Sequence, residues 1–137
     1  MGLYLVIFDG QKEIGGVEVG HYSDFALFRN TVLDRLEPNG LGTRFPTLML
    51  HSDCSGEWTP DESRKLTAEL GEIAAGFKEL PPAEFRPGWQ KNAAKARGSE
   101  PRNLYECLFD PAGKPLVDRL ISLARLSSER HLPILFR

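Results

Sequence analysis

One segment of the sequence, residues 59–82, constrains the fold more than any other. Thr59 is a good N-cap residue, Pro60 suits the first position of a helix, and Glu62 can complete a capping box with Thr59. Apolar residues then recur every three or four positions, at Leu66, Leu70, Ile73, Phe77 and Leu80. Pro81 and Pro82 stop the helix. The segment predicts a long amphipathic helix that must bury one face, and the opposite face carries Arg64, Lys65, Glu69, Glu72 and Lys78.

Two other segments show helical spacing of their apolar residues. Ser23 is a suitable N-cap, and the helix that follows it has its apolar residues at Phe25, Phe28, Val32 and Leu36, before Pro38-Asn39-Gly40. A third helix is predicted from Leu116, Leu120 and Leu123 with Val117, Ile121 and Ala124. Residues 82–103 contain several prolines and glycines, so we expect a flexible surface connection there with a short helix from Gly88 to Ala96.

Short apolar runs between the helices are typical of strands. The first, Leu3 to Phe8, ends at Asp9-Gly10 and fits a strand buried on both faces. A brief alternating segment at residues 17–19 can pair with it as a hairpin around a turn at residues 11–14. We also predict a central strand at residues 47–51, a strand at residues 104–109 and a last strand at residues 133–136.

This order of elements, with the size of the chain, indicates the fold class. The chain has 137 residues, of which 41% are hydrophobic and 26% charged, as in ordinary globular domains. Neither a repeat nor a linker divides it, so we predict a single domain over residues 1–137. The expected architecture is α/β or α+β, a mixed sheet of about five strands packed by about three helices.

Charge and hydropathy exclude several classes of function. The formal net charge is −2 and the sequence has no basic stripe, so direct binding of DNA or RNA is not expected. No apolar stretch approaches the roughly 20 residues that span a bilayer. The apolar run at the N-terminus has no basic residue before it, unlike a signal peptide. We therefore expect a cytoplasmic protein that does not associate with a membrane.

The densest group of reactive side chains lies at residues 51–58. In an enzyme Cys54 could act as nucleophile, His51 as its base, and Asp53 or Glu57 as an orienting or metal-binding group. The spacing does not require this, because catalytic Cys and His usually come from distant positions. As metal ligands these residues mix hard and soft donors on one short turn. We therefore predict neither a catalytic residue nor a bound metal or cofactor.

Each of these residues also has a structural interpretation. Asp53 favours a turn, Cys54 is small enough for a core, and Trp58 can pack beside the helix capped by Thr59. The second cysteine, Cys107, is not spaced to form a metal site with Cys54. Two cysteines are too few for a disulfide framework, so both are expected to be reduced thiols.

Several segments of the sequence carry a resemblance to a known family. They are Gly2 to Leu5, Phe8 to Gly10, Gly16 to Gly20, Arg44 to Trp58 and Leu132 to Phe136. Together they resemble the immunity protein 70 family, whose members are antidotes of bacterial polymorphic toxin systems. The resemblance implies a small cytosolic protein that binds a cognate toxin and blocks it, with no cofactor and no catalytic residue.

An antidote of this kind needs a rigid scaffold and a surface with charged and aromatic anchors. The candidate contact residues are Asp53, Glu57, Trp58, His51, Asp9 and Glu18, with Tyr22 and Trp89 as further aromatic candidates. We hypothesise that the two acids at 53 and 57 steer a basic patch of the toxin while the indole contributes buried area. Two alternatives remain open: a small Cys-dependent or metal-dependent enzyme centred on residues 51–58, and a regulatory domain that binds a small ligand at the strand ends.

Overall fold

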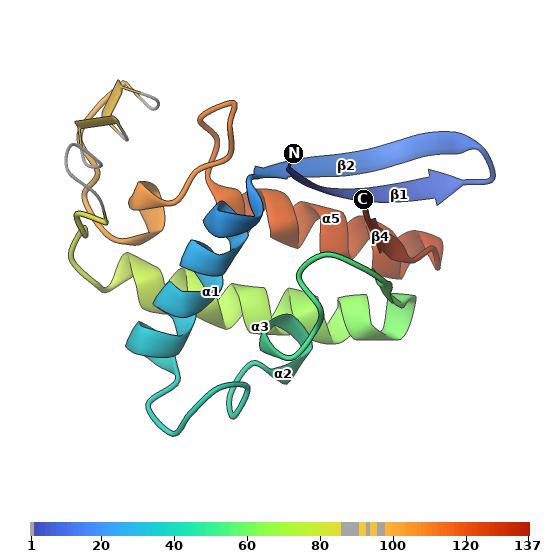
Figure 1. The fold of residues 1–137 in the computed structure, drawn as a ribbon, viewed down its shortest axis with the longest axis horizontal. Helices are drawn as coiled ribbons and strands as arrows, with labels where there is room; N and C mark the ends of the chain where they lie inside the picture. The colour runs from blue at the N-terminus through green and yellow to red at the C-terminus, as the bar shows by residue number, and fades with distance from the viewer. Residues whose placement is uncertain (1, 86–90, 93, 96–97) are drawn as a thin grey trace.

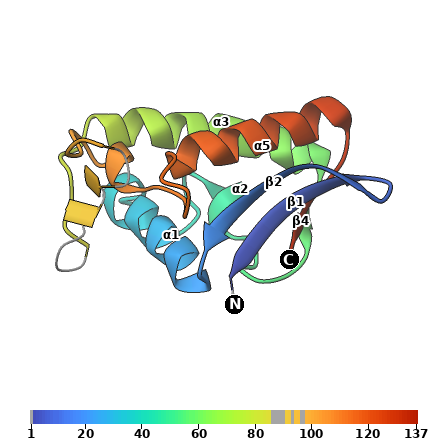
Figure 2. The same ribbon diagram turned by 90° about the horizontal axis from the view of Figure 1, so that it is seen from above.

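A computed structural model describes residues 2–85, 91–92, 94–95 and 98–137. In this part of the chain a four-stranded antiparallel sheet, in the order β2-β1-β4-β3, packs against helices (Figures 1 and 2). The long helices α3 (Pro60–Lys78) and α5 (Leu116–Arg130) lie side by side (Figure 2). The α+β class is confirmed, but the sheet has four antiparallel strands where a mixed sheet of about five was predicted.

The predicted N-terminal hairpin is present and is longer than expected. Strand β1 (Leu3–Asp9) pairs antiparallel with β2 (Lys12–Gly20). The turn consists of Gly10 and Gln11, and Gly10 has φ +65°. A two-residue turn with a glycine at positive φ matches the right-handed twist of the paired strands. The predicted turn at residues 11–14 was wrong because Gly10 and Gln11 already reverse the chain.

The end of the described chain returns to the middle of this sheet. Strand β4 (Ile134–Phe136) pairs with β1 on one side and with β3 (Glu57–Trp58) on the other. The predicted last strand is therefore confirmed. Strand β3 was not predicted, because two residues are too few to show an alternating pattern.

Residues 47–51 do not form the predicted central strand. They belong to a short helix, α2 (Pro46–Met49), and to the turn after it. The Glu69 carboxylate of α3 accepts hydrogen bonds from the backbone N–H groups of Thr47 (3.1 Å) and Leu48 (3.0 Å). These N–H groups have no partner within the helix, so a carboxylate at this end favours the helical conformation. Glu69 is consequently 8% exposed, not on an open polar face as predicted.

A second buried carboxylate shapes the loop before α2. Glu37 is 2% exposed and lies just after helix α1 (Tyr22–Leu36). Its carboxylate accepts hydrogen bonds from the backbone N–H groups of Gly42 (3.2 Å), Arg44 (3.1 Å) and Phe45 (3.0 Å). This side chain satisfies three loop donors that would otherwise lack a partner away from water. Glu37 and Glu69 together hold residues 42–48 in a conformation that no local pattern encodes.

The predicted strand at residues 104–109 was also wrong. The chain forms a 3-10 turn at Tyr105–Cys107, and only an isolated bridge joins Phe109 to Pro115. The Asn103 side chain accepts a hydrogen bond from the backbone N–H of Glu106 (3.1 Å), which favours the turn over an extended chain. Most of the apolar residues of this segment are buried, but they lie in and around a turn and not in a sheet.

The three predicted long helices are confirmed, with one change at an end. The Thr59 hydroxyl accepts from the N–H of Glu62 (3.2 Å) and the Glu62 carboxylate accepts from the N–H of Thr59 (3.0 Å), so α3 begins with the expected capping box. Helix α1 has His21, not Ser23, at its N-cap. The short helix predicted from Gly88 to Ala96 falls largely on residues 86–90, 93 and 96–97, which lie outside the described part of the chain.

The apolar faces of these elements meet in one buried core. Phe28 of α1 packs edge-on against Phe77 of α3, with ring centroids 6.5 Å apart. Phe25 makes the same kind of contact with Phe136 of β4. Such edge-to-face pairs stabilise a core beyond the area they bury. The sheet and the long helices therefore form one rigid scaffold for the loops that carry the candidate site.

Candidate functional site

His51 is held in a structural role. Its ring stacks on Phe136, with centroids 4.4 Å apart and an angle of 20° between the planes. Nδ1 lies 2.8 Å from the carbonyl oxygen of Ser52, and Nε2 lies 2.8 Å from that of Glu57. Both ring nitrogens therefore face backbone carbonyl groups, and neither is directed at a thiol as a general base must be.

The two cysteines lie in different environments. Cys54 is exposed, and its Sγ lies 3.7 Å from the Ser52 hydroxyl. Cys107 is buried, and burial raises the pKa of its thiol. Within the described residues no group of three or more His, Cys, Asp or Glu side chains is arranged to hold a metal ion. The cluster predicted from the sequence thus lacks the geometry of a nucleophile paired with a base.

We expect this difference in burial to appear in thiol chemistry. Cys54 should react quickly with a thiol reagent in the native protein, whereas Cys107 should react only after denaturation, because a buried thiol with a raised pKa provides little thiolate. Titration with and without denaturant measures both sites, and elemental analysis of the same sample measures bound metal. A disulfide, or zinc that survives dialysis, would contradict the prediction and favour the enzyme alternative.

Trp58 was predicted to contribute surface area to a partner, but the structure places it in the core. Its side chain is 1% exposed. The indole Nε1–H donates to the carbonyl oxygen of Thr47 (3.1 Å), and the ring lies 4.8 Å from that of Phe136 between centroids. A side chain with its polar atom satisfied inside the fold cannot be an exposed anchor. We therefore remove Trp58 from the candidate contact surface.

Asp53 and Glu57 lie on the same surface segment but in different settings. Asp53 is half-buried near Arg29, whose guanidinium donates to the carbonyl oxygens of Leu48 (3.2 Å) and His51 (2.7 Å). Burial lowers the pKa of Arg29, and the charge of Asp53 partly opposes that shift. Glu57 is exposed on β3. The side chain of Glu57 is therefore accessible to a partner, whereas that of Asp53 is only partly accessible.

The other two predicted acids lie at opposite ends of the β1–β2 hairpin. Asp9 stands at the hairpin turn, where its carboxylate forms an ion pair with Arg130 (3.1 Å). Glu18 is exposed near the far end of β2 and borders a pocket. The six predicted contact residues therefore do not form one site, and only Glu18 lies at this pocket.

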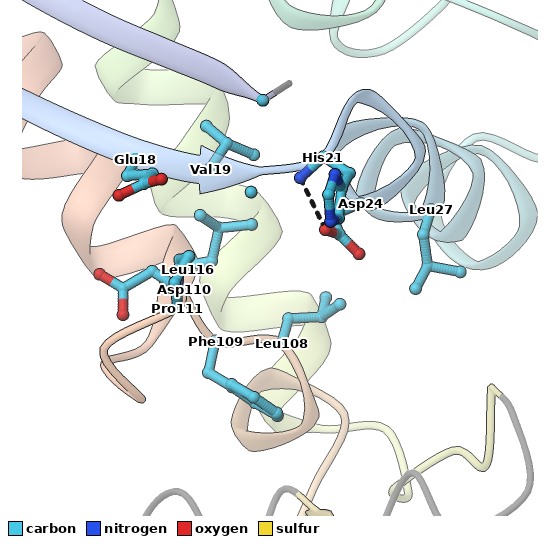
Figure 3. Close-up of a pocket in the computed structure, with 12 residues that line it drawn as sticks. Glu18, Val19, His21, Asp24, Leu27, Leu108, Phe109, Asp110, Pro111 and Leu116 are labelled. Carbon is cyan, nitrogen blue, oxygen red and sulfur yellow. Dashed lines mark hydrogen bonds between the residues drawn. The ribbon is translucent and has the colours of Figure 1, made fainter.

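The pocket that Glu18 borders has a volume of about 520 Å³. It lies between the end of β2, the first turns of α1 and the loop before α5 (Figure 3). Its apolar lining consists of Val19, Leu27, Leu108, Phe109, Pro111 and Leu116. Gly2, Glu18, Gly20, His21, Asp24 and Asp110 complete it. A pocket with mostly apolar walls and a few polar groups is typical of a binding site.

Local geometry explains how the chain forms one wall of this pocket. Gly20 has φ +113°, and a Cβ at this position would lie 2.7 Å from Oδ2 of Asp24. The same Oδ2 accepts a hydrogen bond from the backbone N–H of His21 (2.8 Å; Figure 3). Only glycine fits this backbone conformation without strain. The end of β2 can therefore turn directly into α1, which brings Glu18 and Asp24 to one cavity.

Comparison with known proteins places this structure in a family. The sequence model described as Immunity protein 70 matches residues 3–136. The chain belongs to the Immunity protein 70 family. The match runs from the first residue of β1 to the last residue of β4, so it includes all four strands of the sheet. Neither the curated proteins nor the solved structures that were searched contain a match.

In this member of the Immunity protein 70 family the pocket is bordered by three carboxylates. Asp110 is 4% exposed and accepts from the N–H groups of Ala112 (3.0 Å) and Lys114 (2.9 Å). Its other oxygen lies 3.2 Å from Nε of Arg119. Glu18 is exposed to solvent. The sequence gives no local sign of this pocket, because residues 18–27 and 108–116 meet only in the folded chain.

Among the residues that the structure describes, no helix is both long enough and apolar enough to cross a membrane.

Proposed function

We propose that this chain binds a cognate toxin of a bacterial polymorphic toxin system and neutralises it through protein–protein contact. The family match over residues 3–136 is the observation that carries the proposal. Immunity proteins generally act without catalysis, so the function needs a stable scaffold and a recognition surface instead of a reaction centre. The rigid core and exposed polar loops provide such a scaffold.

The geometry at residues 51–58 supports binding over catalysis. His51 directs both ring nitrogens at carbonyl oxygens, and the described residues contain no cluster suited to a metal. The same segment carries surface groups that a partner can contact. Leu50 is 62% exposed, and Asp53 and Glu57 follow it in the chain. An exposed apolar side chain in the same segment as two carboxylates fits a partner surface that is basic around an apolar centre.

Production of the chain together with its toxin tests the function directly. The toxin domain encoded by the neighbouring gene should kill or arrest cells when produced alone, and this chain should restore growth. The two proteins should also co-purify at a stable ratio. A variant with a disrupted core, such as Leu70→Asp, controls for protection that does not need the folded chain. Failure of the folded chain both to protect and to bind this toxin would reject the proposal.

A charge-neutral double variant tests the surface at residues 51–58. Asp53→Asn with Glu57→Gln preserves shape and removes two charges, so the protein should melt normally while association with the toxin slows and becomes less sensitive to salt. Glu72→Gln with Glu79→Gln makes the same charge change at exposed positions of α3 and its C-cap and serves as the matched control. Stopped-flow association at two salt concentrations measures the effect. Equal association rates for both pairs would place the interface elsewhere.

A further inference from the structure

We propose that the pocket between β2, α1 and the loop before α5 receives an arginine side chain of the toxin. The inference rests on the proposed function, and it names the chemistry of the partner at a place other than residues 51–58. Three properties of the pocket support it: its size, its apolar walls and the sign of the charge around it.

The pocket is large enough for one long side chain and the residues next to it. Its volume of about 520 Å³ lies within the range of sites that enclose small ligands. In Figure 3 Leu116 lies between Glu18 and Asp24, and Leu108 lies below Asp24. The methylene groups of an arginine can pack on these apolar side chains while the guanidinium stays at the polar edge.

The charge around the pocket favours a cation. Glu18, Asp24 and Asp110 border it, and the described residues that line it include no lysine or arginine. The charge of Asp110 is compensated by Arg119, which lies outside the lining. The Glu18 side chain is exposed and forms no hydrogen bond or ion pair with the residues that the structure describes. A cation is therefore attracted, and walls of low polarity strengthen its interaction with these carboxylates.

Among cationic side chains the arrangement suits arginine best. Its planar guanidinium carries five N–H donors and can bridge two carboxylates or bind one through two parallel hydrogen bonds. The guanidinium is also less strongly hydrated than an ammonium group, so it is more readily placed against apolar walls. An anionic group would instead meet the carboxylates of Glu18 and Asp24, the second of which lies in the first turn of α1.

Charge reversal at Glu18 is the first test. Glu18→Lys places a cation at the pocket, so the dissociation constant for the toxin should rise by about tenfold or more. Glu72→Lys makes the same charge change at an exposed position of α3 that does not line the pocket, and it should change the constant by less than about twofold. Both variants should melt like the parent, because both positions are exposed. Isothermal titration with the purified toxin domain measures the constants.

A double-mutant cycle identifies the occupant. Each surface arginine of the toxin is changed to lysine and to alanine, and each surface lysine is changed to alanine. Each variant is then measured against the parent chain and Glu18→Gln. One arginine should show coupling with Glu18, and its lysine variant should lose at least part of that coupling. Coupling to a toxin lysine alone, or equal effects of Glu18→Lys and Glu72→Lys, would overturn the inference. If the parent chain itself does not bind the toxin, the proposed function fails instead.

Discussion

Replacing Trp58 with alanine should lower the free energy of unfolding by about 3–5 kcal/mol, the usual cost of removing a buried tryptophan. The indole is fully enclosed, so the change leaves a cavity beside His51 and Phe136. It also removes the N–H group that the carbonyl oxygen of Thr47 accepts from. Urea denaturation followed by circular dichroism measures the loss, and the midpoint should fall while the slope stays constant.

Trp58→Phe is the matched variant for this prediction. It retains an aromatic ring in the core but lacks the indole N–H, so it should destabilise less than alanine does. Toxin binding by the folded fraction of either variant should stay near that of the parent, because the side chain does not reach the surface. Parental stability combined with lost binding would show that the indole belongs to the interface after all.

Replacing Glu37 with alanine should destabilise the fold by about 2–4 kcal/mol, since buried donors that lose their acceptor cost about 1–3 kcal/mol each and part of this loop can recruit water. The variant removes the acceptor for the N–H groups of Gly42, Arg44 and Phe45. Phe45 is fully buried, so its N–H group cannot turn to solvent without opening the core. Chemical denaturation measures the change in stability.

Two controls separate the role of this carboxylate from that of any glutamate. Glu37→Gln keeps one acceptor oxygen and should lose less stability than the alanine variant. Glu72→Ala removes an exposed glutamate and should change stability by less than about 0.5 kcal/mol. Hydrogen exchange should show faster exchange of the amide protons of residues 42, 44 and 45 in Glu37→Ala. Unchanged exchange at these amides would mean that the loop is held by other contacts.

Helices and strands whose conformation is set by consecutive residues could be predicted from the sequence. Those that depend on residues far away in the chain could not. The periodicity of the three long helices and the capping box at Thr59 are properties of consecutive residues, as is the apolar run of β1. Residues 47–51 and 104–109 are also apolar runs, but a short run fits a strand, a turn or a helix equally well. Glu69, distant in the sequence, decides the first case by capping α2. In the second case Asn103 favours a turn.

The candidate site was harder to predict than the fold. Reactive residue types at 51–58 drew attention to that segment, yet the structure uses His51 and Trp58 for packing. Glu18 was selected as a charged residue within a family-like segment, and it does border the pocket. The opposite wall comes from residues 108–116, of which residues 108 and 109 were predicted as the end of a strand. A pocket made by two distant segments has no signature in either one.

The pairing of β1 with β4 has a consequence for how the protein folds. The β1–β2 hairpin can form from neighbouring residues, but the centre of the sheet needs Leu5 to meet Phe136 across almost the whole described chain. Long-range pairing of this kind slows folding, because much of the chain must be ordered before the contact forms. We expect the rate-limiting step to be the closure of β4 onto β1. A fragment that lacks either strand would leave an open sheet edge prone to aggregation.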